Sequence, residues 1–90
     1  MGVKINIHQN LQHLTNDQDI VEVSGSTVGQ CLDHLVKQFP GIEKELFDKN
    51  NKLLSYVEIY INEESAYPDE LAKPVKDGDE LYIVLIIAGG

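Results

Sequence analysis

The sequence predicts an α+β fold in which a mixed β-sheet packs on one main helix. Four short segments alternate apolar and polar residues with a period of two, which is typical of strands that bury one face. One longer segment, residues 27–39, instead repeats its apolar residues at helical spacing. The chain has 90 residues, of which 42% are hydrophobic, so we expect one domain over residues 1–90 with a single core.

The first two strands are predicted at residues 3–8 and 20–23. Val3, Ile5 and Ile7 alternate with polar residues, so they define the buried face of the first strand. Residues 10–19 between the two segments are polar and rich in turn formers. We therefore expect the two strands to form an N-terminal hairpin.

The main helix is predicted to begin after Thr27, which is a favourable N-cap residue. Gln30 follows three positions later, as in a capping box, and Pro40 with the next glycine ends the helix. The apolar residues fall at i, i+4, i+7, i+8 and i+11, which forms one continuous stripe. The stripe consists of Val28, Leu32, Leu35, Val36 and Phe39.

The second half of the chain predicts a short helix and two more strands. Residues 43–47 suggest the helix, residues 56–62 the third strand and residues 80–87 the last strand. Two prolines make residues 63–76 irregular, and Gly78 supplies positive φ for the turn that follows. The residues that we expect to be nearly buried are Leu32, Leu35, Val57, Ile59, Ile61 and Ile83.

The order of elements is hairpin, helix, strand, irregular crossover and strand. A hairpin whose sheet wraps one amphipathic helix, completed by two later strands, is the β-grasp arrangement. It gives the helix stripe and the apolar strand faces a shared two-layer core.

Charge excludes one class of partner. The chain has fifteen acidic residues against seven lysines and a net charge of −8, so a phosphate backbone would be repelled and we expect no nucleic-acid binding. An acidic domain favours partners with basic docking surfaces. Because no stretch is long and apolar enough to span a bilayer and no signal peptide is recognisable, we expect no membrane association and a cytoplasmic location.

The C-terminal residues Gly89 and Gly90 suggest the chemistry. A diglycine has no Cβ, so it can enter a narrow tunnel and bring the terminal carboxylate to a nucleotide in a partner. Adenylation of the Gly90 carboxylate, followed by displacement of AMP by a sulfur donor, would leave a nucleophilic thiocarboxylate. The chain has no P-loop, so we expect it to bind no cofactor itself and the activating partner to use the ATP. We also expect Gly89 and Gly90 to be uncovered.

Six ordered motifs carry a family resemblance. They lie at residues 23–29, 39–42, 46–48, 57–62, 76–80 and 88–90. Together they resemble the MoaD/ThiS family of ubiquitin-like sulfur carriers, and most closely the MoaD-type small subunit of molybdopterin synthase. The resemblance implies a carrier that is not itself an enzyme. Its implied partners are a ubiquitin-activating-like adenylyltransferase and the molybdopterin synthase large subunit, or another sulfur-accepting enzyme.

Three alternatives stay open. The chain could be a sulfur carrier for cysteine biosynthesis, a near second within the same family. It could be a ubiquitin-like modifier that forms an isopeptide from Gly90 to a target lysine. It could also be a plain β-grasp interaction module, in which case truncating the tail would leave function intact.

A docking surface is predicted beside the tail. Period two places alternate residues of the last two long strands on the sheet face opposite the core, where exposed apolar side chains suit a partner interface. The predicted partner-binding residues are Tyr60, Tyr82, Val84, Ile86, Ile87 and Ala88.

Other candidate sites are weaker. Cys31 and His34 lie one helical turn apart, but two ligands without a further cysteine do not make a metal site, and we expect a structural role. His8 and His13 lack a catalytic partner and are expected at the surface. The acidic turn around Asp77 lacks the spacing of a calcium loop, so no metal site is predicted.

Overall fold

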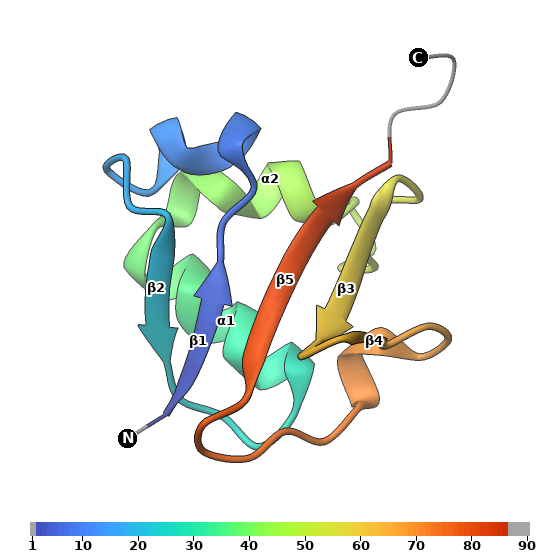
Figure 1. The fold of residues 1–90 in the computed structure, drawn as a ribbon. Helices are drawn as coiled ribbons and strands as arrows, with labels where there is room; N and C mark the ends of the chain where they lie inside the picture. The colour runs from blue at the N-terminus through green and yellow to red at the C-terminus, as the bar shows by residue number, and fades with distance from the viewer. Residues whose placement is uncertain (1, 87–90) are drawn as a thin grey trace.

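Five strands form one mixed sheet in the order β2-β1-β5-β3-β4 (Figure 1). The computed structural model describes residues 2–86. Within this range β1 and β5 are parallel, and every other neighbouring pair is antiparallel. The strands are β1 Val3–Asn6, β2 Ile20–Val23, β3 Val57–Ile61, β4 Glu64–Ser65 and β5 Glu80–Leu85.

The helices lie on one face of this sheet. Figure 1 shows α1 and α2 behind the strands, while the opposite face of the sheet has no helix across it in the described part of the chain. This arrangement confirms the predicted mixed sheet packed on one main helix. The α-helices are α1 Val28–Gln38 and α2 Glu43–Leu46, and the 3₁₀ helices are η1 Gln9–Leu14, η2 Pro40–Ile42 and η3 Glu70–Ala72.

The start of α1 follows the predicted N-cap with one change. Thr27 Oγ1 accepts the N–H of Gln30 at 3.2 Å, as expected of an N-cap. In a capping box the Gln30 side chain would return to the N–H of Thr27. Its Oε1 instead accepts both the N–H and the hydroxyl of Ser26, each at 2.8 Å. The helix is therefore fixed to the loop one residue further upstream than the pattern predicts.

The core lies between α1 and the sheet, and most of the predicted core residues are in it. Leu32, Leu35 and Ile59 have no exposed surface, and Val57 and Ile83 are 5% and 3% exposed. The prediction for Ile61 is wrong, since this residue is only partly buried. Ile61 lines an open groove beside β4, so one side of its side chain faces solvent.

The 3₁₀ helices and the short strand β4 were not predicted from the sequence. Residues 10–19, expected to be a turn region, contain most of η1, with Leu11 in the core and Thr15 fully buried. His8 caps this 3₁₀ helix, because its Nδ1 accepts the N–H of Asn10 at 3.0 Å. Strand β4 adds two residues to the edge of the sheet through pairing with Tyr60 and Ile61.

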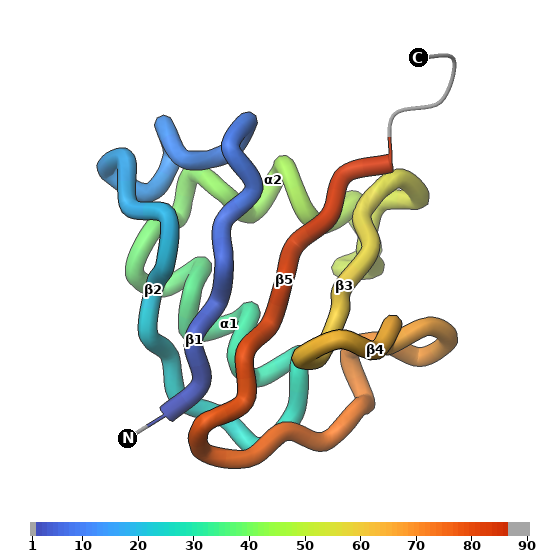
Figure 2. Tube along the Cα trace, viewed as in Figure 1, coloured from blue at the N-terminus to red at the C-terminus, as the bar shows by residue number. Residues whose placement is uncertain are grey.

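The path of β5 determines where the C-terminal tail leaves the domain. β5 lies between β1 and β3, and it runs parallel to β1 from the register pair Lys4 and Glu80 (Figure 2). Its last residues are therefore at the end of the sheet opposite the start of β1. The N–H of Ile86 donates to the carbonyl of Tyr56 at 2.7 Å, so pairing with the β3 side continues to the last described residue.

Candidate functional site

The sheet face opposite α1 carries the predicted docking residues. Tyr60 and Tyr82 are directly opposite each other on β3 and β5, and Glu58 is opposite Val84 in the same ladder. Residues that are directly opposite each other in a ladder lie on the same face of the sheet. The residues that alternate with them along the two strands, such as Ile59, lie on the other face and are buried in the core. Tyr60 and Tyr82 therefore stand on the side of the sheet away from the core.

This face is partly apolar and open. Tyr82 is 38% exposed and Ile86 is 49% exposed, while Tyr60 and Val84 are partly buried by their neighbours. A contiguous exposed apolar surface of this kind marks an interaction site more often than single exposed residues do. The structure thus brings four of the predicted partner-binding residues together on one surface.

Two further apolar residues belong to the same face but were not among the predicted partner-binding residues. Tyr56 immediately precedes β3 opposite Ile86, and Ile20 on β2 pairs with Asn6, which in turn pairs with Tyr82. Both side chains are 45% exposed. The signal for Ile20 was in the sequence, because its alternation with the buried Val21 places it on the outer side. We call Ile20, Tyr56, Tyr60, Tyr82, Val84 and Ile86 the outer-face cluster.

Carboxylates border the two central tyrosines. The Tyr82 hydroxyl donates to Glu80 Oε1 at 3.3 Å, and Asn6 Nδ2 donates to the same oxygen at 3.1 Å. The negative charge of Glu80 is the main cause that raises the pKa of Tyr82. A hydrogen bond with Glu58 is the main cause that raises the pKa of Tyr60. Both phenols therefore stay neutral at physiological pH, and the face combines an apolar centre with acidic neighbours.

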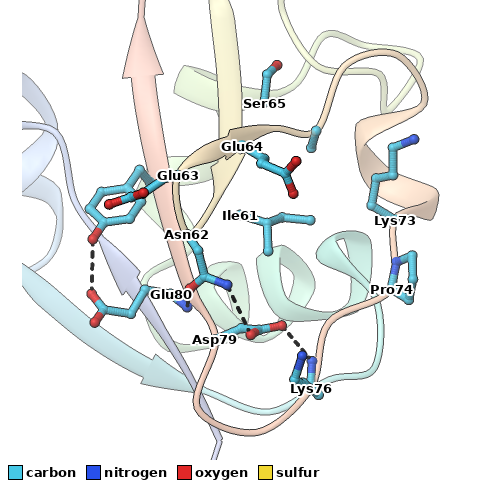
Figure 3. Close-up of a pocket in the computed structure, with 12 residues that line it drawn as sticks. Ile61, Asn62, Glu63, Glu64, Ser65, Lys73, Pro74, Lys76, Asp79 and Glu80 are labelled. Carbon is cyan, nitrogen blue, oxygen red and sulfur yellow. Dashed lines mark hydrogen bonds between the residues drawn. The ribbon is translucent and has the colours of Figure 1, made fainter.

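A polar groove of about 780 Å³ lies beside β4, and one of the charged side chains that line it, Asp79, holds the turn before β5 (Figure 3). Asp79 Oδ1 accepts from Asn62 Nδ2 at 3.2 Å and its Oδ2 accepts the N–H of Lys76 at 3.0 Å. These two hydrogen bonds lower the pKa of the Asp79 carboxyl, and the bond from the Lys76 N–H has the larger effect. Gly78 in this turn has φ +92°, as the sequence predicts. Because both carboxylate oxygens already have protein donors, the arrangement favours a structural turn over a calcium site.

The remaining sequence candidates, Cys31, His34 and His13, do not form a catalytic or metal site in the described residues. Cys31 is fully buried, and burial raises the pKa of its thiol, so the residue is not placed to act as a nucleophile. His34 Nδ1 accepts the N–H of Ser24 at 2.8 Å instead of approaching a metal. Among residues 2–86, no three histidine, cysteine or acidic side chains cluster as metal ligands would. His13 is exposed, as expected.

Four predicted site residues, Ile87, Ala88, Gly89 and Gly90, lie outside the described residues. The last residue that the structure describes before them is Ile86, which directly follows β5 and is itself in the outer-face cluster.

Comparison with known proteins decides the family. The model of the ThiS family matches residues 5–90. The chain belongs to the ThiS family. Within curated proteins, this ThiS-family chain is 34% identical to the sulfur carrier protein CysO of Mycobacterium tuberculosis over the full length of both. It is 31% identical to small archaeal modifier protein 1 of Haloferax volcanii, over 80% of this chain and 92% of the modifier.

Solved structures confirm the β-grasp fold. CysO in the Amycolatopsis orientalis BexX/CysO complex has a TM-score of 0.90 and 32% identity, covering 99% of this chain and 100% of that one. Mycobacterium tuberculosis CysO has a TM-score of 0.87 and 31% identity, over 96% and 100%. Small archaeal modifier protein 1 of Haloferax volcanii has a TM-score of 0.84 and 26% identity, over 98% of each chain.

These relatives change the preferred subfamily. The sequence resemblance was assigned most closely to the molybdopterin synthase small subunit, whereas the similarity to CysO supports the alternative, a carrier for cysteine biosynthesis. The broader assignment to the MoaD/ThiS sulfur carriers is confirmed by the ThiS match. As for the membrane, none of the helices between residues 2 and 86 has the length and apolarity to cross one.

Proposed function

We propose that this ThiS-family chain is a sulfur carrier of the CysO kind, which supplies sulfur for cysteine biosynthesis from a thiocarboxylate on Gly90. The observation that carries the proposal is the 34% identity to CysO over the whole of both chains. The likeness in fold to two CysO structures, with TM-scores of 0.90 and 0.87, supports it.

The proposed chemistry takes place in a partner enzyme. A carboxylate oxygen of Gly90 attacks the α-phosphate of ATP, and pyrophosphate leaves, which gives an acyl-adenylate. Hydrosulfide supplied by a sulfur donor then attacks the acyl carbon, AMP leaves and the sulfur loses its proton, so that Gly90 holds a thiocarboxylate. The thiocarboxylate anion is the nucleophile for the transfer to the acceptor. The carrier presents the group, and the nucleotide site and the catalytic residues belong to its partners.

The outer-face cluster is the proposed docking surface for those partners. Tyr82 is on β5 and Ile86 directly follows this strand, so the strand that presents the apolar face also precedes residues 87–90. Docking on this face would set the direction in which Ile87, Ala88, Gly89 and Gly90 extend toward a partner's active site. The carboxylates of Glu58 and Glu80 favour a partner with basic groups around an apolar centre.

The recipient of the sulfur is proposed to be a protein that binds the carrier in a stable complex. In the Amycolatopsis orientalis structure, CysO is in complex with BexX. By analogy, this chain would pass between an adenylyltransferase and a sulfur-accepting enzyme. The molybdopterin synthase large subunit is the weaker candidate for that acceptor.

A second function is favoured by one observation, the similarity to small archaeal modifier protein 1. In this alternative, the activated Gly90 forms an isopeptide bond with a lysine of another protein. Activation of the carboxylate is common to both functions, and only the nucleophile that displaces AMP differs.

The chemical state of Gly90 in cells distinguishes the two functions. The chain, tagged at its N-terminus, is purified from its own organism and its C-terminal peptide is analysed by mass spectrometry, with a Gly90 deletion as the matched control. A thiocarboxylate on Gly90 that is absent from the deletion supports the carrier. Target lysines that carry the tryptic fragment 77–90, which begins after the last lysine of the chain, Lys76, would instead support the modifier. If neither product forms and the deletion retains function, both proposals are wrong and the chain is an interaction module.

A further inference from the structure

Strand β2 is an edge of the sheet, so one side of its backbone has no neighbouring strand in residues 2–86. Antiparallel pairing alternates residues that bond to the partner strand with residues whose N–H and C=O point away from it. The N–H of Ile7 donates to the carbonyl of Asp19 at 2.8 Å. In the register of β1 and β2, this bond shows which alternate residues have backbone groups that point toward β1. The residues whose backbone groups point away from β1 are therefore Ile20, Glu22 and Ser24.

Two side chains of α1 occupy this edge. Gln38 Nε2 donates to the carbonyl of Glu22 at 3.1 Å, and the N–H of Ser24 donates to His34 Nδ1 at 2.8 Å. His34 and Gln38 are four residues apart, so they stand on the same side of the helix, one turn from each other. Neither bond is needed to form the hairpin, because both use groups that point out of the sheet.

The two backbone groups that these side chains bind, the Glu22 carbonyl and the Ser24 N–H, could instead bond to the same two groups of a second copy of the chain. If two copies of β2 paired antiparallel about a two-fold axis at Val23, Glu22 of one copy would face Ser24 of the other. The Glu22 carbonyl would then accept the Ser24 N–H of the second copy, and the exchange would be reciprocal. This register also avoids placing the two Glu22 carboxylates directly opposite each other, which would be destabilising.

We propose that His34 and Gln38 close the β2 edge against pairing with a second copy of this chain. An unpaired edge strand is a template for further pairing, and proteins protect such edges by covering or shortening them. The other edge of this sheet, β4, has only two residues and is protected by its length. The β2 edge has four strand residues and is protected by two side-chain hydrogen bonds. The closed edge leaves the chain a monomer, with the outer-face cluster free.

The test removes both side chains and measures the oligomeric state. The net charge of −8 opposes association, so light scattering after size exclusion is run in about 0.5 M salt, where the Debye length is below about 8 Å. The H34A/Q38A variant should double its apparent mass with increasing concentration, while the wild type stays monomeric. Lys37→Ala, an exposed position on the same helix, should stay monomeric. H34N should also stay monomeric, because the asparagine oxygen can accept the Ser24 N–H.

A third substitution tests the register. Adding Ser24→Pro to H34A/Q38A removes the N–H that the second copy needs and should restore the monomer. A folded H34A/Q38A variant that remains monomeric would overturn the proposal. A dimer that persists after Ser24→Pro would also overturn it, since the dimer would then use another surface.

Hydrogen exchange gives a test that does not depend on the double variant folding. The Ser24 amide of the wild type and of H34N should exchange more slowly than in H34A, as followed by NMR. Equal exchange in all three proteins would show that His34 does not hold this N–H, and the proposal would fail.

Discussion

Asn62 and Asp79 join the end of β3 to the turn before β5 through a hydrogen bond of 3.2 Å between Asn62 Nδ2 and Asp79 Oδ1. Asn62 also makes two hydrogen bonds with Glu80, the residue after Asp79. Its N–H donates to the Glu80 carbonyl at 2.7 Å, and its Oδ1 accepts the Glu80 N–H at 3.0 Å. This junction fixes the register in which β5 begins. The position of the outer-face residues on β5 depends on that register.

Asp79 should make stability depend on pH. Its pKa is lowered in the folded protein, so its contribution is present above the unfolded pKa of about 3.9 and is lost as the pH falls through the folded pKa. Asp79→Asn should lower the free energy of unfolding by about 1–2 kcal/mol at pH 7. The difference from the wild type should shrink in urea melts as the pH falls below the unfolded pKa and through the lowered pKa of folded Asp79. Asp77→Asn, in the same turn but exposed, should change stability by less than about 0.5 kcal/mol.

Gly25 should be intolerant of a side chain, whereas Gly41 should accept one. A Cβ on Gly25 would be 2.9 Å from the Cys31 nitrogen and the same distance from Gln30 Cβ, both in α1. Gly25→Ala should therefore lower the free energy of unfolding by about 1–3 kcal/mol, as overpacking does. A Cβ on Gly41 meets only Leu14 Cδ2 at 3.7 Å, so Gly41→Ala should stay within about 0.5 kcal/mol of the wild type. Equal effects in thermal melts would contradict this difference.

Leu35 should be among the residues on which the core depends most. Its side chain is fully buried between α1 and the sheet. Leu35→Ala should cost about 2–5 kcal/mol, from lost burial and from the cavity left behind. Lys37→Ala, exposed on the same helix, serves as the control and should cost less than about 0.5 kcal/mol. A near-zero loss for Leu35→Ala in denaturant melts would mean that the packing of α1 is wrong.

The outer-face cluster can be tested with tyrosines on and off the face. Tyr60→Asp or Tyr82→Asp should weaken binding to the activating enzyme at least about tenfold, because a charge would enter the apolar centre of the interface. The control is Tyr67→Asp, which is 71% exposed and lies after β4, outside the cluster. Calorimetric titration of the folded variants is the measurement. Normal binding by Tyr82→Asp, or an equal loss in Tyr67→Asp, would place the docking surface elsewhere.

Much of the fold could be predicted because the main elements carry strong local patterns. Val3, Ile5 and the later alternating strands have period two, and α1 has both an N-cap residue and a stop at Pro40. Each of these signals lies within a few residues of the structure that it specifies. The core residues followed from the same patterns.

The features that were missed depend on single contacts, some of them local, and not on a repeating pattern of residues. The strand β4 is two residues long and exists only through pairing with β3, and Ile61 is partly exposed because a groove forms beside that edge. The Gln30 side chain bonds Ser26 because of the loop path, which no local motif encodes. For Ile20, the alternation with Val21 indicates the outer face, and the cross-strand register with Asn6 adds that it lies beside Tyr82.

The central claim is that the working group is the carboxylate of Gly90, and intact-protein mass spectrometry tests it most directly. The chain is incubated with its activating enzyme, ATP and a sulfur donor. Wild type should gain the mass of one oxygen-to-sulfur exchange, localised to Gly90. Deleting Gly90 should abolish the gain, because the carboxylate would fall short of the nucleotide by about 3.5 Å, while stability stays unchanged. Gly90→Ala should be nearly as damaging if the partner's tunnel has no room for a Cβ. An unmodified wild type, or a deletion variant that still gains the mass, would contradict the account.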